Sequence, residues 1–547
     1  MRKLLAVLIL LSIIIIYFIG ISQGPGVNIS NNTRDWIEEW LNKMTLEEKI
    51  GQMIMVGFDG KKVSRELKKL IEINKVGGVI LFERNIESSR QLRELTGSIQ
   101  ELSGNIPLFI AVDQEGGIIN RIDFAQTFPG NMALAATGDK LLAYKMGQAI
   151  GFELKSYGIN MNLAPVLDIS NNPYNPVIGL RSFGDDPALV GEMGAYVIKG
   201  FQEYISAVAK HFPGHGDTSV DSHFALPIIS HSIERLNEVE LRPFKEAIKA
   251  GVDGIMTAHI VYPTFEKEGI PATLSRRILT GLLRKDMDFD GLIITDDMEM
   301  AAITDNYGIE QAAVKSIAAG ADIIMICGYY DNQVKAFKAI KEAVDNEIIS
   351  PHRIDESVER ILRVKYRILN RKNEAGEMAP EEIKRIAEEI SEKSITVLKN
   401  SDVIPLDNSI QDIFLILPHK GRYIEDELRK KVHQLKTCYY SLNPEKSRKD
   451  QIIKETRNAG LIIIATYNAY TNSEQESLVK EIMALNKPVV IIPLGLPYDI
   501  SLFKDSTCIL TGYGYTRPSA QALIKVLFGE IEAKGKLPVK IDLLGKE

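Results

Sequence analysis

Short apolar runs recur at fairly regular intervals over the first two thirds of the chain, and segments with helical periodicity separate them. The stretch IERLNEVELRPFKEAIKAG (233–251) is typical of these separating segments. The runs are rich in Val, Ile and Phe, which favour strands. Eight such runs span residues 52–58, 76–82, 107–113, 160–169, 206–212, 252–262, 291–297 and 321–328.

This alternation predicts an α/β fold, because strands that are joined by helices pair in parallel. Eight units predict a closed (β/α)₈ barrel of the TIM type over residues 34–375, and an open doubly wound sheet is the alternative. Active sites on such barrels lie at the C-terminal ends of the strands. Reactive residues do end or closely follow several runs: Asp113, Asp168, Lys210, His211, His259, Asp296 and Asp297.

The last third of the chain has a pattern of its own. Residues 376–400 are charged and helical in pattern, and we expect them to form a bridge between two domains. Beyond the bridge, helical segments again separate apolar runs, which predicts a smaller αβα sandwich over residues 401–547. The runs span residues 413–418, 461–466, 487–495 and 506–514.

The N-terminus differs from both domains. A basic start, Met1-Arg2-Lys3, precedes an uncharged apolar stretch at residues 4–22, which is near the length that crosses a bilayer. We expect residues 1–23 to be a signal peptide or an N-terminal membrane anchor, and the length of the stretch favours the anchor. The protein is therefore expected outside the cytoplasm, either secreted or held at the outer face of the cell membrane, with possible membrane association through residues 4–22.

Composition narrows the function classes. The chain is 45% hydrophobic and 25% charged, which is typical of a globular protein. Its net charge of −7 argues against a nucleic-acid partner, since such proteins usually carry a basic patch. The three cysteines are scattered and indicate neither a disulfide framework nor a zinc site.

The stretch KHFPGHGDTSVDSHFALP (210–227) is the richest in reactive side chains. Its Gly and Pro residues predict a shaped loop, and loops on rigid scaffolds often carry function. His and Asp could also bind a metal, but their spacing matches no zinc signature, and Lys210 would place a cation against the ion. We therefore expect no metal and no cofactor. The residues in question are Lys210, His211, His215, Asp217, Asp221 and His223.

Two further stretches suggest how a sugar is bound and attacked. Asp296 in TDDMEM (295–300) ends the seventh run, so its carboxylate is expected at the barrel mouth, where it can act as a nucleophile. In AVDQEGGIINR (111–121), Asp113 can accept hydrogen bonds from sugar hydroxyls, and Arg121 can brace it or reach the sugar. Arg181 is a further donor.

These motifs together resemble glycoside hydrolase family 3, and within it the β-N-acetylglucosaminidase branch. The resemblance covers nearly the whole chain after the N-terminal segment. The Asp-Ser-His element inside the 210–227 loop separates this branch from the β-glucosidases of the family. The motifs that carry it are EEKIGQMIMVGF, AVDQEGG, NLAPVLDI, RSFG, KHFPGHGDT, MTAHIVYP, TDDMEM and GKLPV.

The resemblance implies a role for each motif residue. Asp296 would be the nucleophile, and His223 the general acid/base, paired with Asp221. A histidine titrates near neutrality and can both donate and accept a proton, and its carboxylate partner would orient the ring. We expect an extended loop here, in which positions i and i+2 project to the same side. The residues implied to bind N-acetylglucosamine are Asp113, Arg121, Arg181, Lys210 and His211.

The expected function is that of a retaining exo-β-N-acetylglucosaminidase. Its substrate would be an oligosaccharide that contains N-acetylglucosamine, from peptidoglycan fragments or chitin. Three alternatives stay open: a phosphorylase of the same branch, a β-glucosidase or β-xylosidase, and a non-catalytic sugar-binding protein. The presence of Asp296, Asp221 and His223 argues against the last.

Overall fold

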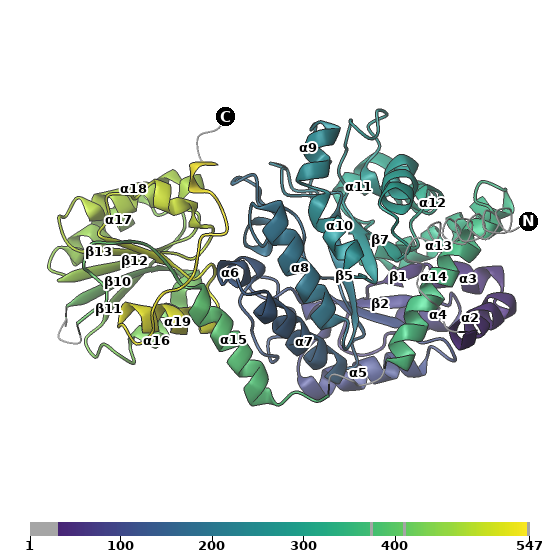
Figure 1. Cartoon of the computed structure of the whole chain (residues 1–547), viewed down its shortest axis with the longest axis horizontal. Helices are drawn as coiled ribbons and strands as arrows, with labels where there is room; N and C mark the ends of the chain where they lie inside the picture. Colours follow the sequence, from purple (N-terminus) through teal and green to yellow (C-terminus); the bar gives the residue numbers. More distant parts are fainter. Residues whose placement is uncertain (1–30, 372–375, 408–411, 544–547) are drawn as a thin grey trace, which may run out of the picture. The chain divides into compact units, whose positions relative to one another are not determined.

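The computed structural model describes residues 31–371, 376–407 and 412–543 (Figure 1). The predicted export segment, residues 4–22, lies outside them. The chain divides into two units, residues 1–44 and residues 45–547. In the first unit, helix α2 (Asn31–Lys43) is described, and no helix of the described residues is long and apolar enough to cross a membrane.

Eight parallel strands close into a barrel in the order β1 to β8. Pairing of β1 with β8 closes the cylinder, which confirms the predicted barrel and excludes the open sheet. All of the predicted runs contain a strand. The strands are β1 (Ile54–Val56), β2 (Gly78–Leu81), β3 (Phe109–Val112), β4 (Met161–Asn162), β5 (Ser206–Phe212), β6 (Gly254–Thr257), β7 (Leu292–Asp297) and β8 (Ile323–Ile326).

Helices surround the barrel (Figure 1). Their boundaries follow local chemistry: before α3, the Thr45 hydroxyl accepts the Glu48 N–H while the Glu48 carboxylate accepts the Thr45 N–H, a capping box. The helices are α3 (Leu46–Gln52), α4 (Arg65–Glu72), α5 (Ser89–Glu101), α6 (Asn131–Ala136), α7 (Lys140–Ser156), α8 (Pro187–Phe201), α9 (Ile233–Glu238), α10 (Arg242–Lys249), the π-helical segment Arg277–Asp286, α11 (Ala301–Tyr307), α12 (Ile309–Ala319), α13 (Tyr330–Asp345) and α14 (Pro351–Asn370).

The second domain is a six-stranded sheet in the order β11-β10-β12-β13-β14-β9. Alternate residues of β10 and β12 enter two separate apolar cores, one on each face, as the period of two along a strand requires. This confirms the predicted sandwich. Its strands are β9 (Thr396–Asn400), β10 (Ile413–Pro418), β11 (Lys436–Tyr440), β12 (Leu461–Thr466), β13 (Val489–Pro493) and β14 (Cys508–Thr511). Its helices are α15 (Pro380–Ser394), α16 (Arg422–Leu428), α17 (Lys446–Thr456), α18 (Ser473–Met483) and α19 (Arg517–Leu527).

The helical bridge is shorter than the predicted segment 376–400. Helix α15 ends at Ser394, and residues 396–400 form β9, which pairs antiparallel with β14 at the edge of the sheet. Strand β11, at the opposite edge, was not predicted. Both edge strands mix buried and exposed positions, so neither contains the continuous apolar run that marks the central strands.

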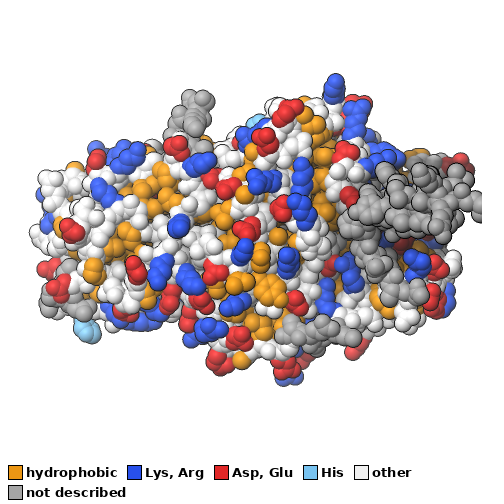
Figure 2. Space-filling model, in the orientation of Figure 1, with side chains coloured by type: hydrophobic (Ala, Val, Ile, Leu, Met, Phe, Trp, Pro, Cys, Tyr) orange, Lys and Arg blue, Asp and Glu red, His pale blue; other side chains and the backbone are white. Residues whose placement is uncertain are grey.

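The C-terminal segment packs against the barrel. Its Lys536 N–H donates to Ala136 O (2.9 Å), and its Pro538 carbonyl accepts the Asp185 N–H (3.1 Å). Leu496 and Tyr513 belong to one buried apolar cluster with residues of α6. The two domains are thus joined by a shared core as well as by α15. Over the face drawn in Figure 2, acidic and basic side chains are interspersed rather than segregated.

Candidate active site

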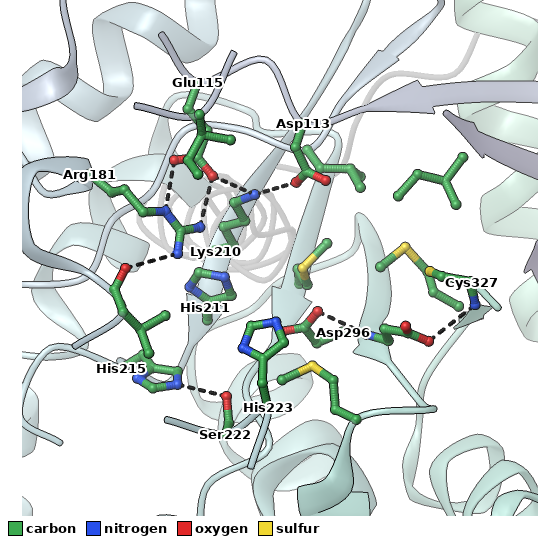
Figure 3. A pocket seen from close by; sticks show the side chains of 18 of the residues that line it. Asp113, Glu115, Arg181, Lys210, His211, His215, Ser222, His223, Asp296 and Cys327 are labelled. Atoms are coloured by element: carbon green, nitrogen blue, oxygen red, sulfur yellow. Dashed lines mark hydrogen bonds and ion pairs between the residues drawn. The ribbon is translucent and has the colours of Figure 1, made fainter. Parts of the chain in front are cut away.

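A pocket of about 220 Å³ lies at the C-terminal ends of the barrel strands (Figure 3). It is smaller than the roughly 300–1,000 Å³ of pockets for drug-sized ligands, and a single sugar unit suits it. The structure brings seven of the eight predicted site residues into its lining, and the eighth, Asp221, contacts His223. The seven are Asp113, Arg121, Arg181, Lys210, His211, His223 and Asp296.

One side of the pocket is a network of paired charges. The Lys210 ammonium lies 2.6 Å from Asp113 and 2.8 Å from Glu115. Arg181 donates two hydrogen bonds to the same Glu115, at 2.9 and 2.8 Å. Burial raises the pKa of Glu115, but Arg181 and Lys210 outweigh it and hold this pKa well below its usual range. Glu115 is therefore ionised and holds the side chains of Lys210 and Arg181 in place.

The loop after β3 needs glycine to form this network. Gly116 and Gly117 have φ values of 86° and 61°, in the left-handed region that glycine tolerates. A Cβ on Gly117 would lie 2.6 Å from the Cα of Gly130. The turn lets Arg121 line the pocket, where it donates to Glu83 (3.0 Å) and not to Asp113. Of the two roles expected for Arg121, bracing Asp113 or reaching the sugar, the first is not seen in this structure, because Lys210 contacts Asp113 instead.

His211 is oriented from behind by a buried carboxylate. Its Nδ1 lies 2.7 Å from Asp168, which also accepts the His215 N–H at 2.6 Å. Burial raises the pKa of Asp168, and the neighbouring His211 more than compensates, so this pKa lies below its ordinary value. Because Nδ1 is engaged, Nε2 is the ring nitrogen of His211 that is left for the pocket.

Asp296 lies at the end of β7, open to the pocket. One of its oxygens accepts the Asp297 N–H at 2.8 Å. Burial raises the pKa of Asp296, but the neighbouring His211, His259 and Lys210 and this hydrogen bond outweigh it. The net pKa lies below the ordinary value, so Asp296 is ionised at neutral pH.

The neighbouring carboxylate, Asp297, has different surroundings. Asp297 accepts the N–H groups of Glu299 and Cys327, each at 3.1 Å. Burial raises the pKa of Asp297 to about 6. Of the adjacent pair, Asp296 is thus the stronger candidate for a nucleophile, because Asp297 already bonds to the backbone of the β7 and β8 loops.

Asp221 and His223 form a pair at the pocket. Asp221 Oδ1 accepts the backbone N–H of His223 at 2.8 Å and lies 2.7 Å from its ring Nδ1. The pairing comes from a turn and not from an extended loop, since the Phe224 N–H donates to the Asp221 carbonyl (3.0 Å). The His223 side chain is 59% exposed, and it lines the same pocket as Asp296 (Figure 3). Ser222 anchors the turn, with its hydroxyl 3.0 Å from His215 Nε2.

Comparisons with known proteins agree with this arrangement. The N-terminal domain of glycosyl hydrolase family 3 matches residues 45–364, and the C-terminal domain of the same family matches residues 395–543. The chain belongs to glycoside hydrolase family 3. It is therefore a glycoside hydrolase, as the motifs predicted.

Several relatives of this family 3 enzyme carry related names. Beta-hexosaminidase A of Pseudoalteromonas piscicida is 31% identical over 91% of this chain and 97% of that protein. The structure of a glycoside hydrolase family 3 beta-N-acetylglucosaminidase from Paenibacillus sp. str. FPU-7 is 37% identical, with a TM-score of 0.85, and the match covers 91% of this chain and 99% of that one. A beta-hexosaminidase of Alkalilimnicola ehrlichii is 35% identical over 50% of this chain and 80% of that protein.

Sequence reasoning gave no role to some residues that shape the site of this family 3 enzyme. Glu115 and Asp168 each follow a barrel strand, which is a usable signal, but their function depends on distant partners. His215 is buried, and burial together with the charge of His211 lowers its pKa to about 4, so it is neutral. His259 is also buried, and its Nε2 lies 2.9 Å from the Asp297 carbonyl. Among the described residues, no group of three or more His, Cys, Asp or Glu is arranged to hold a metal ion.

Proposed function

We propose that this protein is a retaining exo-β-N-acetylglucosaminidase that removes terminal, non-reducing β-linked N-acetylglucosamine. The observation that carries the proposal is the combination of an ionised Asp296 in a pocket for one sugar with the His223–Asp221 pair beside it. The names of the related β-hexosaminidase and β-N-acetylglucosaminidase support the choice of sugar.

In the first step, an Asp296 oxygen attacks the anomeric carbon while the bond from that carbon to the leaving oxygen breaks. His223 gives its proton to the leaving oxygen, so that the aglycone departs as a neutral alcohol. The product is a sugar joined to Asp296 through an ester bond, and His223 is left neutral.

In the second step, His223 takes a proton from water, and the water oxygen attacks the anomeric carbon. The ester bond to Asp296 breaks, and the carboxylate is regenerated. Two displacements at the same carbon retain its configuration. Asp221 holds the ring through Nδ1 and stabilises its protonated form, which leaves Nε2 for proton transfer in both steps.

A histidine suits this position for an electrostatic reason. A second carboxylate beside Asp296 would raise the pKa of the nucleophile by like-charge repulsion, whereas a neutral imidazole would not. When it is protonated, His223 adds a positive charge near Asp296 and favours its ionised form. The acid/base therefore changes charge during the cycle without weakening the nucleophile.

The glycone is held by the charged side of the pocket. Because Glu115 and Asp113 pair with the buried cations, donors and acceptors are fixed before a sugar enters, which lowers the entropy lost on binding. The small volume of the pocket leaves room for one unit, which fits exo cleavage. The residues that we assign to sugar hydroxyls and the acetamido group are Asp113, Arg121, Arg181, Lys210 and His211.

We further propose that the enzyme acts outside the cytoplasm, on peptidoglycan fragments or chitooligosaccharides. This rests on the basic start and the apolar stretch at residues 4–22. Cell fractionation of its own host tests the location: full-length protein that is soluble in the cytoplasm would contradict it.

A panel of p-nitrophenyl β-glycosides tests the activity. We expect the highest kcat/KM on the β-N-acetylglucosaminide and release of the free sugar in water. A higher kcat/KM on the β-glucoside or β-xyloside would overturn the specificity. Faster turnover with phosphate than without, together with a sugar 1-phosphate product, would show a phosphorylase instead.

A further inference from the structure

The backbone at the end of β7 is held by a side chain from the neighbouring strand. Regular pairing of β7 with β6 ends at Ile294, and its pairing with β8 is irregular between Ile294 and Asp297. Irregularities of this kind re-aim side chains and interrupt the ladder of backbone hydrogen bonds. The Asp297 carbonyl accepts a hydrogen bond from Nε2 of His259 at 2.9 Å. His259 thus takes the place of a strand partner at this point.

Asp297 connects His259 to the proposed nucleophile. Its N–H donates to an Asp296 oxygen at 2.8 Å (Figure 3), and its carbonyl accepts from His259. The Asp297 carboxylate accepts the N–H groups of Glu299 and Cys327, each at 3.1 Å. Because the Asp296 carboxylate is held by the backbone of Asp297, a shift of that backbone would move the carboxylate that attacks the sugar.

A chain of hydrogen bonds fixes the ring of His259. A carbonyl oxygen can only accept, so Nε2 carries the ring proton. Burial lowers the pKa of His259, so the ring is neutral at neutral pH and Nδ1 is an acceptor. The Thr273 hydroxyl, 2.8 Å away, donates to Nδ1, and it lies 2.8 Å from the hydroxyl of Thr257. The Ala258 carbonyl, at 3.0 Å, is a more distant acceptor for the Thr273 hydroxyl.

The groups in this chain lie behind the pocket. Thr257 ends β6 (Gly254–Thr257), and Thr273 lies in the short helix Ala272–Leu274. Thr257, His259 and Thr273 are all buried, at 0%, 1% and 0% exposure. The described residues that line the catalytic pocket include neither His259 nor Thr273. The ring therefore acts on the nucleophile and not on the sugar.

We propose that His259 is a positioning residue for the nucleophile: through the Asp297 backbone it holds the Asp296 carboxylate in the geometry that attack requires, and Thr273 fixes the tautomer that does so. The inference rests on the proposed function, in which Asp296 attacks the anomeric carbon. In the other neutral tautomer, the lone pair of Nε2 would face the Asp297 carbonyl oxygen and repel it. Such a displacement is costly, because a misplacement of about 1 Å can cost about 10²-fold in rate.

Thr273→Val tests the inference, because it keeps the shape of the side chain and removes the hydroxyl. We expect kcat/KM to fall roughly tenfold, by the same factor on the p-nitrophenyl and dinitrophenyl β-N-acetylglucosaminides, since attack and not proton donation is impaired. The inhibition constant of free N-acetylglucosamine should change by less than about twofold, because the residues assigned to the sugar are untouched. Thr273→Ser restores the hydroxyl and should restore most of the rate.

Thr511→Val is the matched control. Thr511 is equally buried, and its hydroxyl donates to the Pro493 carbonyl (2.9 Å) in the second domain. Both substitutions should lower the Tm, and only Thr273→Val should lower kcat/KM. At a second position, His259→Leu should lose roughly 10²-fold, and His259→Gln, which keeps an N–H donor, should recover part of that loss.

Equal kcat/KM in folded Thr273→Val and Thr511→Val would overturn the inference. A loss that is larger on the poorer leaving group, or one explained entirely by weaker binding of N-acetylglucosamine, would also overturn it. Thermal unfolding shows which variants are folded, and the His259 variants repeat the test if Thr273→Val is not. Full activity of Asp296→Asn would instead refute the proposed function, so the two failures are distinguishable.

Discussion

Each domain contains an aspartate that is removed from bulk water. The pKa values of these two aspartates are shifted in opposite directions. Asp296 follows β7 in the barrel, and its pKa lies below the ordinary value. Asp499 lies in the short helix after β13 (Pro497–Ser501), and burial raises its pKa to about 7. Asp499 accepts hydrogen bonds from the Thr466 hydroxyl and the Tyr470 N–H, which are both neutral donors.

The comparison shows what keeps a buried carboxylate ionised, as the proposed nucleophile must be. Burial raises the pKa of both groups. Neutral donors do not offset it at Asp499, whereas His211, His259, the Asp297 N–H and the Lys210 ammonium together do so at Asp296. The charges around the pocket, and not the position after a parallel strand, therefore keep Asp296 ionised.

The largest effect is expected from Asp296→Asn. It removes the charge that attacks the anomeric carbon, so turnover should fall by roughly 10⁴-fold or more on every substrate, activated leaving groups included. Steady-state kinetics on the p-nitrophenyl substrate measure the loss. The matched control is Asp499→Asn, the same substitution at the other buried aspartate, which should leave kcat within a factor of about two. Comparable activity in both variants would remove Asp296 from the nucleophile role.

The next largest effect is expected at the proton donor. A carboxyl group with a raised pKa, such as that of Asp499, can donate a proton. In the barrel, however, we assign proton donation to His223. His223→Ala should lose about 10²–10⁴-fold on natural sugars, whose leaving groups need an acid. On a dinitrophenyl glycoside, the first step should be nearly spared, and a burst of phenolate should precede a slow steady state. Asp221→Ala should show a weaker form of this pattern. Equal losses on good and poor leaving groups, with no burst, would assign His223 to substrate binding.

Lys210→Met should leave the carboxylates of the catalytic pocket without one positive neighbour, so that their surroundings become more like those of Asp499. Without the ammonium, Asp113 and Glu115 lose a buried partner, which should cost about 3–5 kcal/mol of folding free energy in urea titrations. The pKa of Asp296 should rise, so the acid limb of the kcat/KM profile should move to higher pH. Lys341→Met, which breaks an exposed pair with Asp345, is the control and should change neither quantity appreciably. An acid limb that stays in place would show that Lys210 does not tune the nucleophile.

The smallest effect concerns Asp499 itself. Its folded-state pKa of about 7 lies above the ordinary value of 3.8, so between these values the folded protein holds a proton that the unfolded chain has released. This contribution to stability is complete below about pH 4 and is lost as the pH rises through 7. Calorimetry should show the Tm of the wild type falling over this window by a few degrees more than that of Asp499→Asn. Parallel Tm profiles would argue that Asp499 is ionised in the folded state.

The architecture could be predicted because the barrel strands and the central sandwich strands are buried on both faces and therefore read as continuous apolar runs. Strands β9 and β11 could not, because they lie at the edges of the sheet and mix exposed with buried positions. The end of the bridge was misplaced for the same reason: TVLKN (396–400) lacks an apolar run, and its pairing with β14 is visible only in the fold.

The site could be predicted in part. Asp113, Lys210 and Asp296 end or follow strands, which the barrel places at one mouth. The function of Glu115 could not be seen, because it depends on Arg181, 66 positions away, and on Lys210. The contact of Arg121 with Glu83 could not be predicted either, because nothing in the sequence brings these two residues together. The catalytic roles came from the family resemblance and remain predictions.

The hydrogen bonds of the Asp221–His223 turn lie mostly within the turn. Its two carboxylate contacts join residues two apart. Ser222 ties the turn to the barrel through its hydroxyl, which contacts His215, and through its carbonyl, which accepts the Ala302 N–H at 3.4 Å. The residues assigned to the sugar, in contrast, come from three neighbouring barrel strands: Asp113 and Arg121 follow β3, Arg181 follows β4, and Lys210 and His211 lie in β5. The proposed proton donor therefore lies on a short loop of its own, and exchange of that loop could alter how the leaving group is activated while the residues assigned to sugar binding stay in place. Loop exchange in an engineered enzyme can use this separation between the proposed proton donor and the residues assigned to the sugar.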